Sequence, residues 1–301
     1  MLNKYKVIIW GHKLHSHTHS YIHNAYYKAF KFLGFETYWL DNSDDISNLN
    51  FDNCIFFTED QVQHSIPLNK NSFYILHHCK LDKYIDNGLR YINLCNYVND
   101  CQLGKSYNYE NSNVEKINYY TYYDSVNKAL YQPWATDLFP EQIAYSFVKL
   151  NKSLNNVYYI GSIWEENIKE IQDFNRACIE NNKQIVSIRN VDDETNKKLI
   201  NESYISPDIR CKGHREVGYI PCRIFKNLSY GHIPATNSIY VRDFFGENSL
   251  PYASDCYDLF KVNEDFINSD ENLENSKFLL SEIKNNHTYL TRVNSLLNFV
   301  Q

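Results

Sequence analysis

The sequence has no uninterrupted apolar run of the roughly 20 residues that a membrane-spanning helix needs. It also has no excess of positive charge, because 30 Lys and Arg stand against 36 Asp and Glu and the formal net charge is −6. Proteins that bind nucleic acid by neutralising phosphates normally carry a basic field. The opening Met1-Leu2-Asn3-Lys4-Tyr5 runs straight into a strand-like segment, unlike a secretion signal. We therefore expect a cytoplasmic protein with no membrane span and no nucleic-acid partner.

Glycine is scarce, and cysteine pairs are missing. None of the eight cysteines lies in a Cys-x-x-Cys pair, so we expect buried thiols in a reducing compartment and no disulfide framework or thiolate zinc site. Residues with AT-rich codons (Asn, Lys and Ile) are abundant, which makes single Asn or Lys residues weak indicators of function. Only 9 glycines occur among 301 residues, so each one is informative. With 43% hydrophobic and 22% charged residues, the chain is neither disordered nor a coiled coil.

The first forty residues have the pattern of a strand, a helix and a second strand. An apolar run at 6–10 ends at Gly11, apolar residues at helical spacing follow at 21–32, and a second strand-like run spans 37–40. This pattern predicts a βαβ unit, which forms a parallel sheet with a right-handed crossover.

Further short strands are expected at 54–57, 73–76, 91–94 and 116–120. The carboxyl ends of parallel strands meet at one edge of a sheet, where ligands bind. Polar residues that follow these strands are therefore candidate binding residues. They are Thr58-Glu59-Asp60 and His77-His78.

A second unit of the same kind begins after residue 133. Strands are expected at 156–160 and 184–188, with an amphipathic helix over 165–181 between them. The proline and the lack of any period at 131–137 indicate a connection between domains. The sequence predicts an α/β fold of two Rossmann-like domains that face a cleft, with a C-terminal helix crossing back. The expected boundaries are 1–133 for the N-terminal domain, 134–271 for the C-terminal domain and 272–301 for a helix packed on the N-terminal domain.

A basic segment near residue 223 has the features of an anion-binding helix. Pro221 fits the first turn of a helix that ends at Gly231, because proline lacks the N–H that would be unsatisfied there. Arg223 and Lys226 are three residues apart, so they share a face near the positive N-terminal end. A helix N-terminus with two cations can hold a diphosphate. A solvated basic face on a surface helix explains the spacing equally well.

The run from Tyr219 to Asn237 resembles the donor-binding segment of GT-B glycosyltransferases, in particular their group-1-like branch. In that segment a Pro-x-Arg-x-Phe-Glu helix precedes a turn with glycine and a strand with a polar end. The matching residues are Pro221, Arg223, Phe225, Gly231 and Pro234. The family's acidic residue, which usually holds the ribose or the sugar, is Lys226 here, and this departure suits a more phosphate-directed role.

Gly161-Ser162, after the first strand of the second unit, is placed like the family's phosphate-facing glycine loop. The resemblance thus implies that domain 134–271 binds a nucleotide sugar and that domain 1–133 binds the acceptor. It implies the following donor-binding residues: Gly161, Ser162, His214, Arg215, Arg223, Lys226, Asn227, Thr236 and Asn237.

Five histidines, at positions 12, 15, 17, 19 and 23, follow the first strand. Inverting GT-B enzymes have a base in this loop, and a histidine has a suitable pKa to accept a proton from a hydroxyl. The resemblance makes His17 the first candidate base, with His15 and His19 as alternatives. His-x-His at a strand end is also typical of metal sites in amidohydrolase and phosphoesterase barrels, but the eightfold βα repeat is missing. A polar loop that caps the next helix explains the histidines without either role.

Together these features predict a metal-independent glycosyltransferase of the hexosyl- or deoxyhexosyltransferase class. Arg223, Lys226 and Arg215 would neutralise the departing diphosphate. We expect a glycan or another hydroxyl acceptor, held by His12, His77 and His78, with no cofactor besides the nucleotide-sugar co-substrate. The alternatives are a metal-dependent hydrolase built on the His15/His17/His19 loop and a non-catalytic sugar-nucleotide-binding module. The residue usage resembles that of low-GC bacteria, protists and large DNA viruses, and a virus is the source we expect. The sequence has no signature of oligomeric state.

Overall fold

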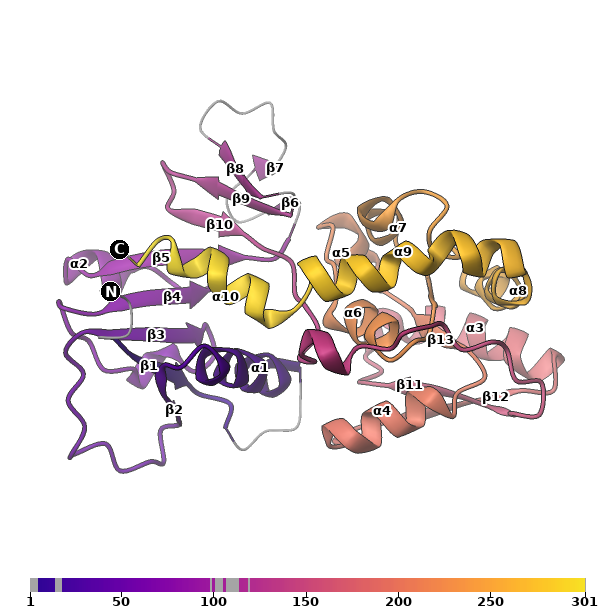
Figure 1. Ribbon diagram of the computed structural model, residues 1–301, viewed down its shortest axis with the longest axis horizontal. Coiled ribbons are helices and arrows are strands. Elements are labelled where there is room, and N and C mark those ends of the chain that lie inside the picture. Colours follow the sequence, from indigo (N-terminus) through magenta and orange to yellow (C-terminus); the bar gives the residue numbers. More distant parts are fainter. Residues whose placement is uncertain are drawn as a thin grey trace. The chain divides into compact units, whose positions relative to one another are not determined.

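The computed structural model describes residues 5–13, 18–97, 99–100, 105–106, 114–118 and 120–300. The chain divides into two compact units (Figure 1). Unit 1 contains residues 1–137 and 289–301, and unit 2 contains residues 138–288. The division falls after Asp137, within the connection expected at 131–137, and differs from the expected boundary at 133.

Unit 1 is built on an eight-stranded sheet in the order β2-β1-β3-β4-β5-β10-β9-β8. Neighbouring strands from β2 to β5 are parallel, as the sequence predicts, and β10, which was not predicted, pairs with β5 in parallel. The pairs β10–β9 and β9–β8 are antiparallel, so the strand expected at 116–120 forms as β8 but does not continue the parallel series. The strands are β1 (Lys6–Trp10), β2 (Glu36–Leu40), β3 (Cys54–Glu59), β4 (Phe73–His77), β5 (Arg90–Cys95), β8 (Val114–Asn118), β9 (Thr121–Asp124) and β10 (Ala129–Tyr131), and a separate hairpin joins β6 (Asn99–Asp100) to β7 (Lys105–Ser106).

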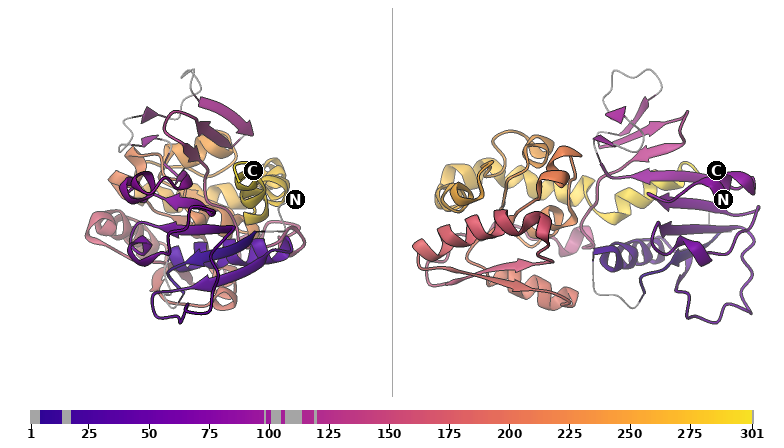
Figure 2. Two further views of the ribbon diagram at one scale, coloured as in Figure 1. Left: turned by 90° about the vertical axis from the view of Figure 1, so that its left-hand side faces the viewer. Right: turned by 180° about the vertical axis from the view of Figure 1, so that it is seen from behind.

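The middle of this sheet is buried on both faces. Val7, Ile8 and Ile9 of β1 are at most 1% exposed, which explains why this strand is apolar throughout and does not alternate. Helices α1 (Thr18–Phe32) and α10 (Tyr289–Leu297) lie side by side on one face of the sheet (Figure 1). Figure 2 shows the strands from the opposite side, and a short helix, α2 (Asp82–Asp86), precedes β5.

The C-terminal tail is two helices, α9 (Asp270–Asn286) and α10, and not the single helix predicted over 272–301. Only residues 289–301 belong to unit 1. There Arg292 of α10 is buried and donates through Nε to the carbonyl of Pro133 at 2.7 Å and through Nη2 to that of Trp134 at 3.0 Å. Burial lowers the pKa of Arg292 to about 10. These bonds fix the segment that leaves the sheet of unit 1.

Unit 2 contains two parallel strand pairs, β11 with β12 and β13 with β14. The pairs are adjacent, because the N–H of Tyr158 in β11 donates to Ser203 Oγ just before β13, at 2.9 Å. Phe174 of α3 and Phe260 of α8 meet in the core with ring centroids 6.1 Å apart. The elements are β11 (Asn156–Ile160), α3 (Ile168–Glu180), β12 (Gln184–Ile188), α4 (Asp193–Asn201), β13 (Ser206–Asp208), α5 (Lys212–Glu216), α6 (Cys222–Ser229), β14 (Pro234–Thr236), α7 (Ile239–Phe245), α8 (Cys256–Asn268) and α9.

Among the described residues, none of the helices combines the length and the apolar composition that crossing a bilayer requires.

Candidate functional site

In unit 1, the carboxyl ends of the parallel strands bring polar side chains together from four parts of the sequence. The chain leaves β1 for β2 on one side and reaches β3 on the other, so the ends of β1 and β3 form a topological switch point. Open α/β sheets bind ligands at such points. His12 follows β1, Glu59 ends β3, His77 ends β4 and Asn96 follows β5.

Glu59 lies at the centre of a histidine cluster. Its carboxylate is buried and accepts a hydrogen bond from His12 Nε2, and His19 Nδ1 lies 4.0 Å from the same oxygen, Oε1. The rings of His19 and His23 pack against the His12 ring with centroids 5.2 and 5.0 Å away. Burial raises the pKa of Glu59, but the hydrogen bonds from His12 and from the N–H of Gln61 outweigh burial and lower that pKa. The cluster therefore surrounds a buried negative charge with imidazoles.

The backbone after β1 holds His12 in position. Gly11 has a φ of +92°, and a Cβ built there would clash with Val62, so a larger residue does not fit. The carbonyl of Gly11 accepts hydrogen bonds from His23 Nδ1 and Trp39 Nε1, each at 2.9 Å. Gly11, one of the few glycines in the chain, thus lies in a turn that positions His12 of the cluster.

His77 and His78, two of the predicted acceptor residues, share one amide. Asn96 Oδ1 lies 2.8 Å from His78 Nε2 and 3.4 Å from His77 Nε2. The His77 ring packs edge-on against Trp134 at 4.7 Å. Burial, together with His78 and His19, lowers the pKa of His77 well below its usual value. His77 is therefore a neutral ring in the wall of the cluster, and His78, which is half-buried, is the more accessible of the two.

The predicted candidate bases fall partly outside the described residues. His15 and His17 lie in the range 14–17, which the structure does not describe. His19 is the third candidate, and its side chain is 28% exposed. For His19, burial lowers the pKa more than the nearby Glu59 raises it. Glu59 was recognised only as a polar strand end, because nothing in the sequence places it beside His12.

In unit 2, Arg223 lies against the loop that follows β11. Its Nη2 donates to the carbonyl of Ile160 at 2.8 Å, and its Cζ lies 4.1 Å from the centroid of the Tyr159 ring. Gly161 has a φ of +150°, and a Cβ built there would clash with Arg223 Nη2. Two residues predicted to bind the donor, Gly161 and Arg223, are therefore in close contact. The Arg223 side chain is 17% exposed, so it does not extend into bulk solvent.

A buried carboxylate links the ends of β13 and β14 to this arginine. Asp208 is fully buried and accepts a hydrogen bond from Arg210 Nε at 2.7 Å. Arg223 Nη1 lies 3.9 Å from the same oxygen, and the Thr236 hydroxyl donates to the other oxygen at 3.3 Å. Asn237 accepts from the backbone N–H of Arg210 at 2.7 Å and donates to its carbonyl at 2.9 Å. Two guanidinium groups share one carboxylate, which leaves a net positive charge.

Of the other predicted donor residues, Ser162 directly follows Gly161, and His214 lies close enough to Arg210 and Asp208 for their charges to affect its pKa. Arg215 pairs with Glu170 at 3.4 Å, so its charge is already compensated. Lys226 is buried in the last turn of α6. It therefore does not lie near the helix N-terminus, where its spacing from Arg223 predicted it. Pro221 is the N-cap residue of α6 and precedes the first turn. Of the remaining three, Asn227 is buried, Ser162 is half-buried and His214 is exposed.

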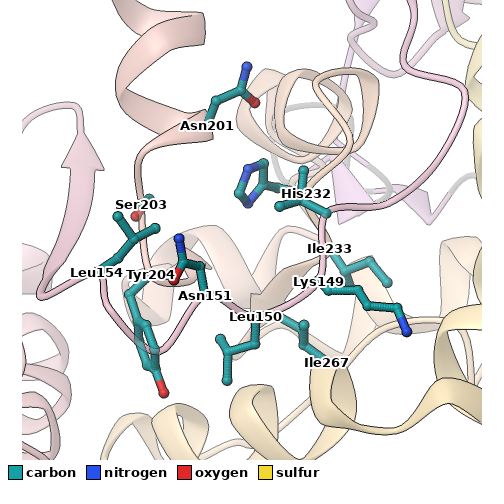
Figure 3. A pocket seen from close by; sticks show the side chains of 11 residues that line it. Lys149, Leu150, Asn151, Leu154, Asn201, Ser203, Tyr204, His232, Ile233 and Ile267 are labelled. Atoms are coloured by element: carbon teal, nitrogen blue, oxygen red, sulfur yellow. The ribbon is translucent and has the colours of Figure 1, made fainter.

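A small pocket of unit 2, about 80 Å³ in volume, has His232 in its wall beside Ile233 and Ile267 (Figure 3). The imidazole is buried, and its Nε2 has no hydrogen-bond partner among the described residues. Burial lowers the pKa of His232 to about 4. This group is therefore neutral in the folded chain at neutral pH.

We expect His232 to make the protein acid-sensitive. Between its ordinary pKa of 6.5 and the folded value of about 4, the unfolded chain binds a proton that the folded chain does not, so stability falls as pH falls through this window. Acidification from about pH 7.5 to about pH 5 costs about 2 kcal/mol through this group. The free energy of unfolding in urea, measured at both pH values, should therefore fall about 2 kcal/mol less on acidification for His232→Gln than for the wild type. The exposed His64→Gln is the control, and an unchanged pH dependence in His232→Gln contradicts the prediction.

No protein-family model and no curated protein matches the sequence. Solved structures do match. An alpha-glucosyltransferase in complex with UDP and a 13-mer DNA containing a HMU base aligns over 98% of this chain and 99% of its own, with a TM-score of 0.61 and 8% identity. An alpha-glucosyltransferase in complex with UDP aligns over the same shares with a TM-score of 0.62 and 9% identity. A third complex, with UDP and a 13-mer DNA containing a central A:G mismatch, has a TM-score of 0.58.

These likenesses span nearly the whole of both chains, although the identity is low. They agree with the parallel sheet of unit 1 and with the parallel strand pairs of unit 2, and they confirm the α/β class expected from the sequence. The chain therefore has the fold of the GT-B glycosyltransferases, as the resemblance of its Tyr219–Asn237 segment predicted.

Proposed function

We propose that the chain transfers a sugar from a nucleoside-diphosphate donor to a hydroxyl group of an acceptor. The observation that carries this proposal is the arrangement in unit 2 of Arg223 and Arg210 around one carboxylate, Asp208, beside the close-packed Gly161. The remaining positive charge stands at the carboxyl ends of β11 and β13, the edge at which α/β folds bind nucleotides.

A diphosphate suits this place for two physical reasons. Arginine presents planar donors that match phosphate oxygens, and such charge-assisted bonds are about twice as strong as neutral ones. Arg223 Nη1 is buried, makes no hydrogen bond among the described residues and lies 3.9 Å from its nearest carboxylate oxygen. It therefore retains an unused donor, which a shift of the side chain would present to an incoming oxygen.

In the proposed reaction, the bond between the anomeric carbon and the diphosphate oxygen breaks, and the electron pair leaves with the nucleoside diphosphate. A bond forms between the anomeric carbon and the acceptor oxygen, and the acceptor hydroxyl loses its proton. Arg223 and Arg210 would stabilise the charge that grows on the departing diphosphate. Because these cations belong to the protein, we expect donor chemistry without added Mg²⁺ or Mn²⁺.

The uridine nucleotide and the hexosyl class are supported by the comparisons alone. The matching glucosyltransferases are complexes with UDP, so UDP-glucose is the first donor to test. For the acceptor, we assign binding and deprotonation of the hydroxyl to the histidine cluster of unit 1, with His12 and His78 at the sheet edge.

The expected exclusion of nucleic acid is no longer a sound constraint on the acceptor. It rested on the net charge of −6, which is a whole-chain sum and sets no limit on a local surface. Two matching structures contain DNA, one of them with a HMU base. DNA that carries an HMU base is therefore a candidate acceptor beside glycans.

Incubation with UDP-glucose should give a product heavier by one hexose, detected by mass spectrometry, with an acceptor from a panel of oligosaccharides and hydroxymethylated DNA duplexes. We expect turnover in buffer without added Mg²⁺ or Mn²⁺. UDP should also raise the melting temperature, since a ligand at 100 times its Kd stabilises the folded state by about 2.7 kcal/mol. UDP binding without turnover of any donor would instead identify a binding module, and no response to any nucleoside diphosphate would refute the proposal.

A further inference from the structure

We propose that His12, His19 and Glu59 form a binding site for one divalent transition-metal ion, for which Zn²⁺ is the best fit. His12 follows β1, His19 lies in the first turn of α1 and Glu59 ends β3. One ligand atom from each side chain lies within 4.8 Å of the other two. The three side chains thus converge on one point from three separate elements.

The ligand set decides which class of ion fits. Two imidazole nitrogens and one carboxylate oxygen are the donors that zinc prefers, whereas Mg²⁺ and Ca²⁺ prefer oxygen ligands throughout. In a tetrahedral site with bonds of roughly 2.1 Å, ligand atoms stand about 3.4 Å apart. An ion would therefore replace the hydrogen bond between His12 and Glu59 and draw His19 inward from its 4.0 Å separation.

The surroundings favour a prepared site over a chance cluster. The carbonyl of Gly11 is held by His23 and Trp39, which fixes the backbone from which His12 projects. Glu59 is buried, and the 28% exposure of the His19 side chain provides a way in. Three protein ligands leave one tetrahedral position open for water or another hydroxyl.

A hydroxyl at that open position would lose its proton more readily, because a bound metal ion lowers the pKa of a coordinated oxygen. This consequence rests on the proposed function, in which an acceptor hydroxyl must be deprotonated. Metal binding itself does not, because its ligands lie in unit 1 and the proposed donor cations lie in unit 2.

The test uses the full chain without an affinity tag, stripped with a chelator and titrated with Zn²⁺ and with Co²⁺. We expect one equivalent of zinc per chain by elemental analysis, and visible d–d absorption typical of tetrahedral Co²⁺. His12→Ala, His19→Ala and the near-isosteric Glu59→Gln should each weaken binding more than roughly 100-fold, beyond the range seen for residues outside the ligand set. The exposed His64→Ala is the matched control and should bind like the wild type.

Circular dichroism and melting curves establish whether each variant is folded. If an alanine variant does not fold, the near-isosteric Glu59→Gln still tests the site. Failure of the wild type to bind a stoichiometric ion would overturn the proposal, as would binding that all three ligand variants retain. UDP binding is measured on the same samples. A wild-type chain that binds UDP but no stoichiometric zinc refutes only the metal site, whereas a wild-type chain that binds zinc but no UDP refutes only the proposed function.

Discussion

Replacing Arg223 with Ala is expected to lower kcat/KM for the nucleotide sugar by roughly 10- to 100-fold, the range for a lost charge-assisted bond to phosphate. The guanidinium packs on Tyr159 and reaches both the Ile160 carbonyl and the Asp208 carboxylate. Its removal leaves one of the two cations at the proposed diphosphate site. Steady-state kinetics with a varied donor, together with calorimetric titration of UDP, measure the effect.

Two variants make this result specific. Arg176→Ala removes an arginine whose side chain is 61% exposed and pairs with Asp173 within α3, so donor kinetics should not change. Arg223→Lys keeps the charge but loses the planar pair of donors. Its kcat/KM for the nucleotide sugar should therefore lie between those of Arg223→Ala and the wild type. Equal donor kinetics in Arg223→Ala and the wild type would remove this residue from the site.

Gly161→Ala should weaken donor binding nearly as much as Arg223→Ala does, although it adds a single methyl group. The new Cβ would occupy the space of Arg223 Nη2, and the φ of +150° at this position is strained for any L-residue. The arginine must move, so we expect the Kd for UDP to rise at least about tenfold. Titration calorimetry with UDP measures this.

Gly213→Ala is the matched control, because a Cβ on Gly213 in α5 meets nothing within 4 Å. If Gly161→Ala acts by displacing Arg223, the double variant Gly161→Ala/Arg223→Ala should bind UDP about as weakly as Arg223→Ala alone. Fully additive losses would show that the glycine acts on its own.

The strand ends that build the unit 1 site could be predicted because buried parallel strands have an unmistakable pattern. The apolar run of β1 and the polar residues after β3 and β4 placed His12, Glu59 and His77 at one edge. The pairing of His12 with Glu59 could not be predicted, because it depends on strand order. That order places β3 beside β1 across the switch point, and no local pattern encodes it.

In unit 2, the contact between Gly161 and Arg223 agrees with the sequence resemblance, but Asp208 and Arg210 were missed. Asp208 ends β13, and Arg210 follows two residues later. This strand has only three residues and includes Pro207, so it shows neither alternation nor an apolar run. The carboxylate that orients both arginines thus lies on the element with the weakest local signal.

Helical spacing also has a limit that Lys226 illustrates. A separation of three residues places two side chains on one face, but it does not say how far along a short helix they lie. In the eight residues of α6, Lys226 already belongs to the last turn. Likewise, periodicity joined 272–301 into one helix, whereas α9 ends at Asn286 and α10 begins at Tyr289.

The most direct test of the central claim is a crystal structure of the chain with UDP. We predict diphosphate oxygens within hydrogen-bonding distance of the Arg223 guanidinium, beside Gly161 at the end of β11. A well-ordered UDP whose phosphates contact neither Arg223 nor Arg210 would contradict it.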